Sequence, residues 1–160
     1  MINCTDIYGK IHKIEKSKLI KRPSAYGIYI KDHKILIIQN LLNLKWELPG
    51  GGLDKNENDF LALEREFKEE TGLKTSGEYK KIYFQTNFFF DLFTNSGEGW
   101  DSLKTYYLIK NAKGSLIQGN GDDSKASKFI GARELKSLFE QNNLNNINKI
   151  LLNKIIKLLR

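Results

Sequence analysis

Residues 51–73, GGLDKNENDFLALEREFKEETGL, hold a high density of carboxylates for a chain whose formal net charge is +7. The acidic side chains of this stretch are Asp54, Glu57, Asp59, Glu64, Glu66, Glu69 and Glu70. Like charges this close repel one another unless a cation neutralises them. Lys55, Arg65 and Lys68 supply only part of that positive charge. The pattern therefore indicates either a bound cation or a solvated acidic surface.

The spacing of three glutamates favours the bound cation. Glu66, Glu69 and Glu70 stand at i, i+3 and i+4, so on a helix they share one face. A solvated helix face usually mixes charge signs, whereas this face gathers three carboxylates. Mg²⁺ is a hard ion that prefers carboxylate oxygens and is commonly held together with substrate phosphates. The stretch has no EF-hand spacing, so we do not expect a dedicated calcium site, and on charge pattern alone a solvated acidic face stays the simpler interpretation.

A helix over residues 58–71 would position these carboxylates. Asn58 suits the N-cap, and Gly72 is well placed to end the helix in a left-handed conformation. The apolar side chains recur at intervals of three and four residues and predict a buried stripe: Phe60, Leu63 and Phe67.

The rest of the chain predicts interspersed strands and helices. AYGIYIK and KILIIQN read as a hairpin that turns at Asp32-His33. Further strands are expected at 7–14, 46–48, 79–94, 103–110 and 115–118, loops at 49–52 and 119–128, and helices at 132–141 and 144–159. This order predicts an α/β fold in one domain, residues 1–160, with an N-terminal strand region over about 1–20 and C-terminal helices over about 132–160.

Composition narrows the functional class. The longest apolar runs are too short to span a bilayer, and the start of the sequence has no secretory pattern. A single cysteine, Cys4, fits a reducing compartment, so we expect a cytoplasmic protein. The excess of 26 Lys and Arg over 19 Asp and Glu attracts anions. A small polyphosphate fits this charge, and nucleic acid is a weaker alternative, since no RNA-binding motif is present.

The spacing of the acidic stretch resembles a known motif. Gly51, five residues, Glu57, seven residues and then the run REFKEETGL from Arg65 match the Nudix box, G-x5-E-x7-R-E-U-x-E-E-x-G-U, where U is a bulky apolar residue. The preceding residues 46–50, WELPG, are similar to the usual lead-in to the box. The resemblance implies a Nudix-type α/β/α sandwich with a mixed β-sheet, in which the box forms a loop–helix–loop. It also implies metal-dependent hydrolysis of a nucleoside diphosphate linked to another group.

The resemblance also assigns roles to residues of the box. Glu66, Glu69 and Glu70 would be catalytic carboxylates that bind Mg²⁺, or Mn²⁺ in its place. The Gly50 carbonyl would be a further ligand, Glu57 would support the metal site, and Arg65 would orient a glutamate.

The resemblance further implies a general base, which in this family often lies outside the box. We favour Asp123 by its register before the 132–141 helix, with Glu98 as a rival, while Glu66 or Glu70 could itself serve. An ordinary turn at residues 122–123 is an equally good interpretation. The residues expected to contact substrate are Arg22, Tyr26, Gly51 and Phe88.

The chain lacks the sequence markers of several Nudix subfamilies, and this narrows the expected substrate. Markers typical of Nudix enzymes acting on ADP-ribose, dinucleoside polyphosphates and NADH are missing, and Phe88 stands where some of them would fall. What is left resembles nucleoside triphosphate pyrophosphatases, including those acting on oxidised purines. ADP-ribose or nucleotide-sugar hydrolysis, RNA-end processing and a non-catalytic nucleotide sensor stay open. We expect a monomer or homodimer without a membrane partner, and a basic amphipathic C-terminal helix that packs on its own sheet.

Overall fold

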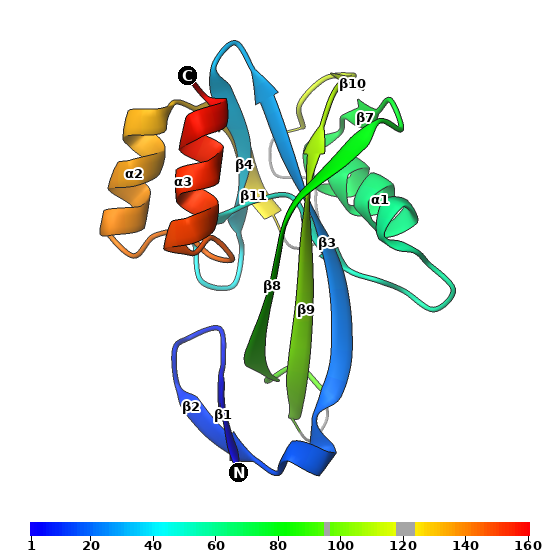
Figure 1. Cartoon of the computed structure of the whole chain (residues 1–160), viewed down its shortest axis with the longest axis vertical. Helices are drawn as coiled ribbons and strands as arrows, with labels where there is room; N and C mark the ends of the chain where they lie inside the picture. Colours follow the sequence, from blue (N-terminus) through cyan, green and yellow to red (C-terminus); the bar gives the residue numbers. More distant parts are fainter. Residues whose placement is uncertain (95–96, 118–123) are drawn as a thin grey trace.

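A computed structural model describes residues 1–94, 97–117 and 124–160 (Figure 1). The helices are α1 (Asp59–Thr71), α2 (Ala132–Glu140) and α3 (Lys149–Leu158), with a short 3₁₀ turn at Lys16–Lys18. The strands are β1 (Ile2–Thr5), β2 (Ile11–Ile14), β3 (Ile20–Lys31), β4 (Lys34–Asn40), β5 (Trp46–Glu47), β6 (Gly50–Gly52), β7 (Lys74–Thr75), β8 (Tyr79–Asp91), β9 (Glu98–Ile109), β10 (Ala112–Lys113) and β11 (Ser124–Ile130).

The main sheet is mixed and runs in the order β11-β4-β3-β9-β8-β1-β2, with β6 paired to β3 and β5 to β4. The pairs β3–β9 and β1–β8 are parallel, and the other pairs are antiparallel. Helix α1 covers one face, whereas α2 and α3 lie on the other (Figure 1). This mixed sheet between helices confirms the predicted α/β fold.

Each face of the sheet has its own apolar core. Under α1, Leu63 and Phe67 are buried and pack with residues of β3 and β9. On the opposite face, Leu151 and Ile155 of α3 are buried in a second cluster with Ile28. The basic amphipathic helix therefore packs on its own sheet, as expected. Phe60, predicted to be buried, is 47% exposed, because it lies in the first turn of α1, where its ring packs only against Tyr79 and the edge of Tyr107 among the aromatic rings.

Local sequence signals correctly predicted the first hairpin turn and the two ends of α1. The β3–β4 hairpin turns at Asp32 and His33, which both adopt positive φ (49° and 58°), as a two-residue hairpin turn requires. Helix α1 begins after Asn58, whose Oδ1 accepts from the N–H groups of Phe60 and Leu61, both at 3.0 Å. It ends at Gly72 with φ 77°, the left-handed conformation that glycine adopts without strain.

Long-range pairing corrected several local expectations. Part of the predicted 119–128 loop is strand β11, a polar segment that pairs with β4. The glycines at 50–52 form strand β6 against β3 and not a loop, and residues 115–117 are not a strand. The predicted 144–159 helix begins only at Lys149, because Asn148 caps α3 by accepting from the N–H of Leu151. Within the part of the chain that the structure describes, no helix is long and apolar enough to cross a membrane.

Candidate active site

Arg65 joins the loop before α1 to the helix. Its Nε donates to Glu57 Oε1 and its Nη2 to Glu57 Oε2, both at 2.8 Å. Its Nη1 donates to Glu66 Oε1 at 2.7 Å, and Nη2 also reaches the Gly52 carbonyl at 3.2 Å. One guanidinium therefore fixes the loop, strand β6 and a box glutamate relative to one another, as a planar fork can.

Glu57 and Arg65 shift each other's pKa values. Hydrogen bonds from Arg65, and then from the Asp54 N–H, lower the pKa of Glu57 to about 2. The hydrogen bond to Glu57 raises the pKa of Arg65, although burial opposes that rise. Both oxygens of Glu57 are used in these contacts, so in this arrangement Glu57 holds the site in place through Arg65. Direct contact of Glu57 with a metal stays a prediction.

Strand β6 lies closely against two glutamates of α1. The Gly50 N–H donates to Glu70 Oε2 at 2.8 Å, and a Cβ on Gly51 would lie 2.7 Å from Glu66 Oε1. Gly50 has φ 136°, and a Cβ there would lie 2.2 Å from the Ala25 carbonyl oxygen. Glycine is therefore required at position 50, where the backbone leaves no room for a Cβ, and glycine at position 51 leaves space for Glu66 beside the backbone of β6.

The donor chemistry around α1 fits a hard cation. Glu69 is the most exposed of the three box glutamates, with 60% of its side chain accessible, and its Oε2 lies 3.6 Å from Arg65 Nη1. Within residues 1–94, 97–117 and 124–160, no three His, Cys, Asp or Glu side chains form a ready-made metal cluster. The candidate ligands offer only oxygen atoms, which suit Mg²⁺ or Mn²⁺ better than softer metals.

A cavity of about 1100 Å³ opens on the face of the sheet opposite α1, beneath the loop between α2 and α3. Its lining includes Tyr26, Glu47, Gly50, Phe89, Trp100 and Lys104. Gly50 is therefore shared, because its N–H contacts Glu70 while the residue also lines the cavity. The carboxylates of α1 and the cavity meet at strand β6.

Tyr26 lies where the cavity approaches the carboxylates. Burial raises its pKa most, and the charges of Glu47, Glu70 and Glu66 raise it further. Its ring stacks on Tyr106, with centroids 5.4 Å apart. The phenol is therefore neutral at physiological pH and provides a flat surface at this end of the cavity.

Arg22 lies at the edge of the same region. Its guanidinium lies over the ring of Trp100, which lines the cavity, at 5.3 Å from the ring centroid. Its Nη2 is 3.0 Å from the position that a Cβ on Gly52 would take. The predicted substrate residues Arg22, Tyr26 and Gly51 thus lie around β6, where the Arg22 guanidinium could bind a substrate phosphate.

The other predicted residues lie elsewhere. Phe88 is 40% exposed and does not line the cavity, whereas its neighbour Phe89 does, because successive residues of a strand face opposite sides. Glu98 is the first residue of β9, and its Oε2 accepts from Nε1 of Trp100 at 3.2 Å, so it lies beside the ring that Arg22 covers. Asp123, the favoured base, and its neighbour Asp122 lie outside the described residues.

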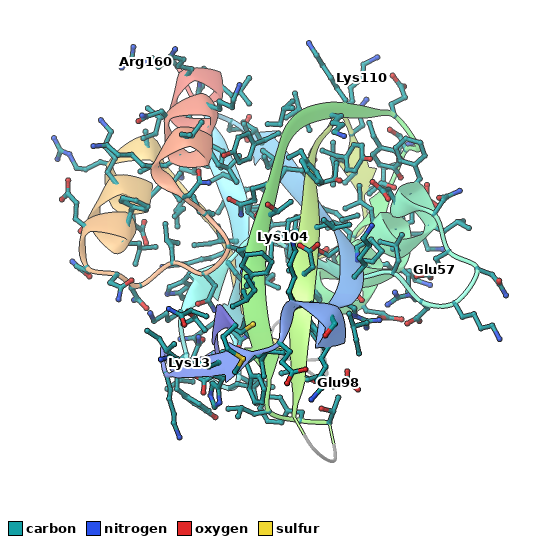
Figure 2. All side chains as sticks on the ribbon, turned by 60° about the horizontal axis from the view of Figure 1, so that its bottom comes forward. Lys13, Glu57, Glu98, Lys104, Lys110 and Arg160 are labelled. Carbon is teal, nitrogen blue, oxygen red and sulfur yellow. The ribbon has the colours of Figure 1, made fainter. Side chains whose placement is uncertain are left out.

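Sequence reasoning missed two charged residues of the cavity. Glu47 Oε1 accepts from Asn40 Nδ2 at 2.9 Å, and its Oε2 accepts from Asn145 Nδ2 at 3.0 Å. Its place in the lead-in three residues before Gly50 was the available signal. Lys104 lies at the middle of the sheet (Figure 2). The signal available for it was a lysine between the apolar Leu103 and the run TYYLI of a predicted strand.

Comparison with known proteins gives one matching family model and two curated relatives. A family model described as NUDIX domain matches residues 21–151. The chain is 29% identical over 111 residues to an RNA pyrophosphohydrolase of Pelagibacter ubique (strain HTCC1062), which covers 67% of this chain and 59% of that protein. It is 47% identical over 53 residues to an 8-oxo-dGTP diphosphatase of Buchnera aphidicola subsp. Schizaphis graminum (strain Sg), covering 30% of this chain and 40% of that protein. The matched segments thus span less than two thirds of either relative.

Solved structures share the fold. The E. coli ORF135 protein superposes with a TM-score of 0.64 at 20% identity and covers 90% of this chain and 94% of its own. A MutT NUDIX hydrolase from Burkholderia pseudomallei superposes with a TM-score of 0.60 at 19% identity, over 86% of this chain and 97% of its own. At these identities the likeness concerns the fold.

Proposed function

This chain belongs to the Nudix family, and on that premise we propose that it hydrolyses a nucleoside triphosphate to a nucleoside monophosphate and pyrophosphate. The observation that carries the proposal is the meeting of two features at strand β6. Glu66 and Glu70 approach β6 from α1, and a cavity large enough for a nucleoside begins at the same strand. A diphosphate at β6 could then place its nucleoside in the cavity.

The proposed metal ligands are carboxylates and one carbonyl: Glu66, Glu69, Glu70 and Gly50. Mg²⁺ is the expected ion, and Mn²⁺ would suit the same oxygen donors. When bound, such an ion neutralises phosphate oxygens, favours deprotonation of a nucleophilic water and stabilises the leaving phosphate. Glu57 and Arg65 hold the loop and Glu66 in position, so they act through the ligands and do not touch the substrate.

The chemical step is a substitution at phosphorus. The oxygen of a water molecule bonds to phosphorus, and the bridging P–O bond breaks with its electron pair on the departing pyrophosphate. The proton of the water passes to a carboxylate. Asp123 stays our predicted base, and Glu66 or Glu70 is the alternative within the box. Glu98, which is hydrogen-bonded to Trp100 at the start of β9, stays the rival candidate outside the box.

One alternative substrate is favoured by a specific observation. The relative from Pelagibacter ubique is named an RNA pyrophosphohydrolase, and the net charge of +7 would attract an RNA 5′ end. We rank the free nucleotide above RNA because the turn between β1 and β2 and the loop between α2 and α3 both border the cavity. ADP-ribose, nucleotide sugars and a purely sensing role rank below both.

We also propose a cytoplasmic location and a monomer or homodimer. The free, buried Cys4 is compatible with a reducing compartment, and burial raises the pKa of its thiol. Size-exclusion chromatography with light scattering would test the oligomeric state.

A substrate panel tests the proposed function. Ordinary and oxidised nucleoside triphosphates, ADP-ribose, nucleotide sugars and 5′-triphosphate RNA would be incubated with Mg²⁺, and products would be separated by ion-exchange chromatography. We expect nucleoside monophosphate and pyrophosphate from a triphosphate, and no turnover after EDTA treatment. Faster release from RNA than from every free nucleotide would replace the proposal with RNA-end processing. No turnover of any substrate would favour the sensing role.

A further inference from the structure

Lys104 is a buried cation inside the cavity. It lies on β9, is 8% exposed and lines the cavity wall. Its Nζ donates to Asn146 Oδ1 at 2.5 Å. Among the described residues, Lys104 has no ion pair, and Glu47 is the one carboxylate whose charge acts on it at longer range. An ammonium group has three donors, so Lys104 can offer hydrogen bonds to a bound molecule.

Packing alone does not explain an ammonium group at this position. Burial disfavours the charged form and lowers the pKa of Lys104 to about 8. Methionine would fill a similar length of cavity without that desolvation cost. Buried charges with perturbed pKa values gather at functional sites, where they serve binding or chemistry. The group is therefore better explained by a ligand that needs a donor.

Strand register places Lys104 away from the diphosphate. Gly52 of β6 pairs with Ser24 of β3, which pairs with Lys104 of β9. The Lys104 backbone thus lies two strand spacings, roughly 10 Å, from the box strand. Consistently, Glu66 and Glu70 influence the pKa of Tyr26, whereas Glu47 is the only one of these three that influences Lys104. This separation matches the distance from the diphosphate to the base of a nucleotide.

The surroundings of Lys104 are rigid and rich in hydrogen bonds. The Tyr106 hydroxyl donates to the Asn146 carbonyl, and Gln85 Nε2 donates to the Tyr106 hydroxyl. Asn148 Nδ2 donates to Gln85 Oε1, so the network continues to the cap of α3. Asn146 adopts φ 59°, a left-handed conformation that asparagine tolerates. Since Asn146 Oδ1 is used by Lys104, its amide leaves the Nδ2 donor for a ligand.

This part of the cavity therefore offers donors to the ligand, and it is flanked by aromatic rings. The ring of Tyr26, which lines the cavity, stacks on that of Tyr106, two residues along β9 from Lys104, whereas Phe89 and Trp100 line the cavity four residues away along the β8–β9 pair. Aromatic rings can stack on a base, whereas donors select its edge. A guanine-type purine presents two neighbouring acceptors, O6 and N7, to a lysine. Adenine presents an amino group in place of O6, which would oppose the ammonium.

We propose that Lys104 is a specificity-determining residue that donates to the 6-keto oxygen of a purine base, so that guanine-type nucleotides are preferred to adenine nucleotides. The inference rests on the proposed function, because it assumes that a nucleotide occupies the cavity with its diphosphate at β6. It assigns the choice of base to β9 and not to the box.

Equilibrium binding tests the inference without relying on turnover. The α,β-methylene analogues of GTP, of ATP and of 2-aminopurine riboside triphosphate, which lacks the 6-keto oxygen, would be titrated calorimetrically with Mg²⁺ present. Wild type, Lys104→Met and Lys104→Gln would be compared with Lys45→Met, which removes a lysine from the same cavity wall. Melting temperatures would verify that each variant is folded.

We expect wild type to bind the GTP analogue about 10–100-fold more tightly than the other two, the range for one hydrogen bond to a charged group. Lys104→Met should weaken only GTP-analogue binding, Lys104→Gln should retain part of the preference through its amide donor, and Lys45→Met should keep the preference. Equal weakening of all three analogues by Lys104→Met, or no preference in wild type, would overturn the inference. Selective binding without any turnover in the substrate panel would instead overturn the proposed enzymatic function and leave the role of Lys104 standing.

Discussion

Arg65 holds Glu57 through two parallel hydrogen bonds, Nε to Oε1 and Nη2 to Oε2, each 2.8 Å long. The same guanidinium donates to Glu66 at 2.7 Å, so a residue that touches no substrate in our account controls where a proposed metal ligand lies. The loop before α1 and the face of α1 that carries Glu66 are therefore held together as one unit.

Arg65→Lys should disturb this unit without unfolding the protein. Lysine keeps the charge but cannot form the bidentate pair. The group is partly exposed, so we expect a loss of about 1–2 kcal/mol in the free energy of unfolding, from urea titration. Turnover should fall by roughly 10–100-fold, because a ligand displaced by about 1 Å costs that order of rate. Arg133→Lys, an exposed position on α2, is the control and should change neither quantity. Full activity in Arg65→Lys would contradict the positioning role.

The Glu57–Arg65 pair predicts a dependence of stability on pH. The pKa of Glu57 is lowered from 4.5 to about 2, so the native state binds its proton less readily than the unfolded chain. Its contribution to stability is therefore complete above about pH 5 and is lost as the pH falls towards 2. Urea titrations at pH 6 and pH 3 should show a smaller difference between wild type and Glu57→Gln at pH 3. An unchanged difference would mean that the pair adds no pH-dependent stability.

Gly51→Ala should impair activity while the fold survives. The added Cβ would lie 2.7 Å from Glu66 Oε1, at the end of a side chain that can move away. Glu66 would then leave its position beside β6, and we expect roughly a 100-fold loss of turnover. Gly131→Ala is the matched control, since nothing lies within 4 Å of its added Cβ. Equal turnover in the two variants would show that the approach of Glu66 to β6 is unimportant.

Base selectivity should depend on pH through Lys104. Its pKa is lowered to about 8, so the ammonium donor is lost as the pH rises through that value. The other charged side chains that line the cavity, within the described residues, are Asp6, Lys45 and Glu47. The preference for GTP over ATP analogues should decline between pH 7 and pH 9 in wild type and stay level in Lys104→Gln. A parallel decline in the variant would assign the effect to another group.

The sequence predicted the parts of the site that depend on local rules. Asn58 and Gly72 fixed the ends of α1, and the spacing of three glutamates placed them on one face. The hairpin turn at Asp32 and His33 was equally predictable, because two apolar strands joined by only two residues can pair in few other ways.

Other features depend on pairing between distant segments. The parallel pairing of β3 with β9 places Lys104 beside Ser24, 80 residues earlier, and no local pattern encodes that contact. The face of Phe88 was equally hard to predict, because the register of β8 shifts between Lys81 and Tyr83. Such a bulge moves every following side chain to the other face. Strand β11 was not predicted because its residues are polar, and their extended conformation comes from pairing with the edge of β4.

The most direct test of the central claim compares two neutralised carboxylates on one helix. Glu70→Gln changes the side chain that accepts from the Gly50 N–H, whereas Glu64→Gln makes the same change on the side of α1 that meets Tyr79. Pyrophosphate release from the best triphosphate would be followed with Mg²⁺ in both variants. We predict a loss of roughly 1,000-fold or more in Glu70→Gln and less than about 3-fold in Glu64→Gln, with both proteins folded. Equal activity in the two variants would contradict a metal-dependent reaction centred on the box glutamates.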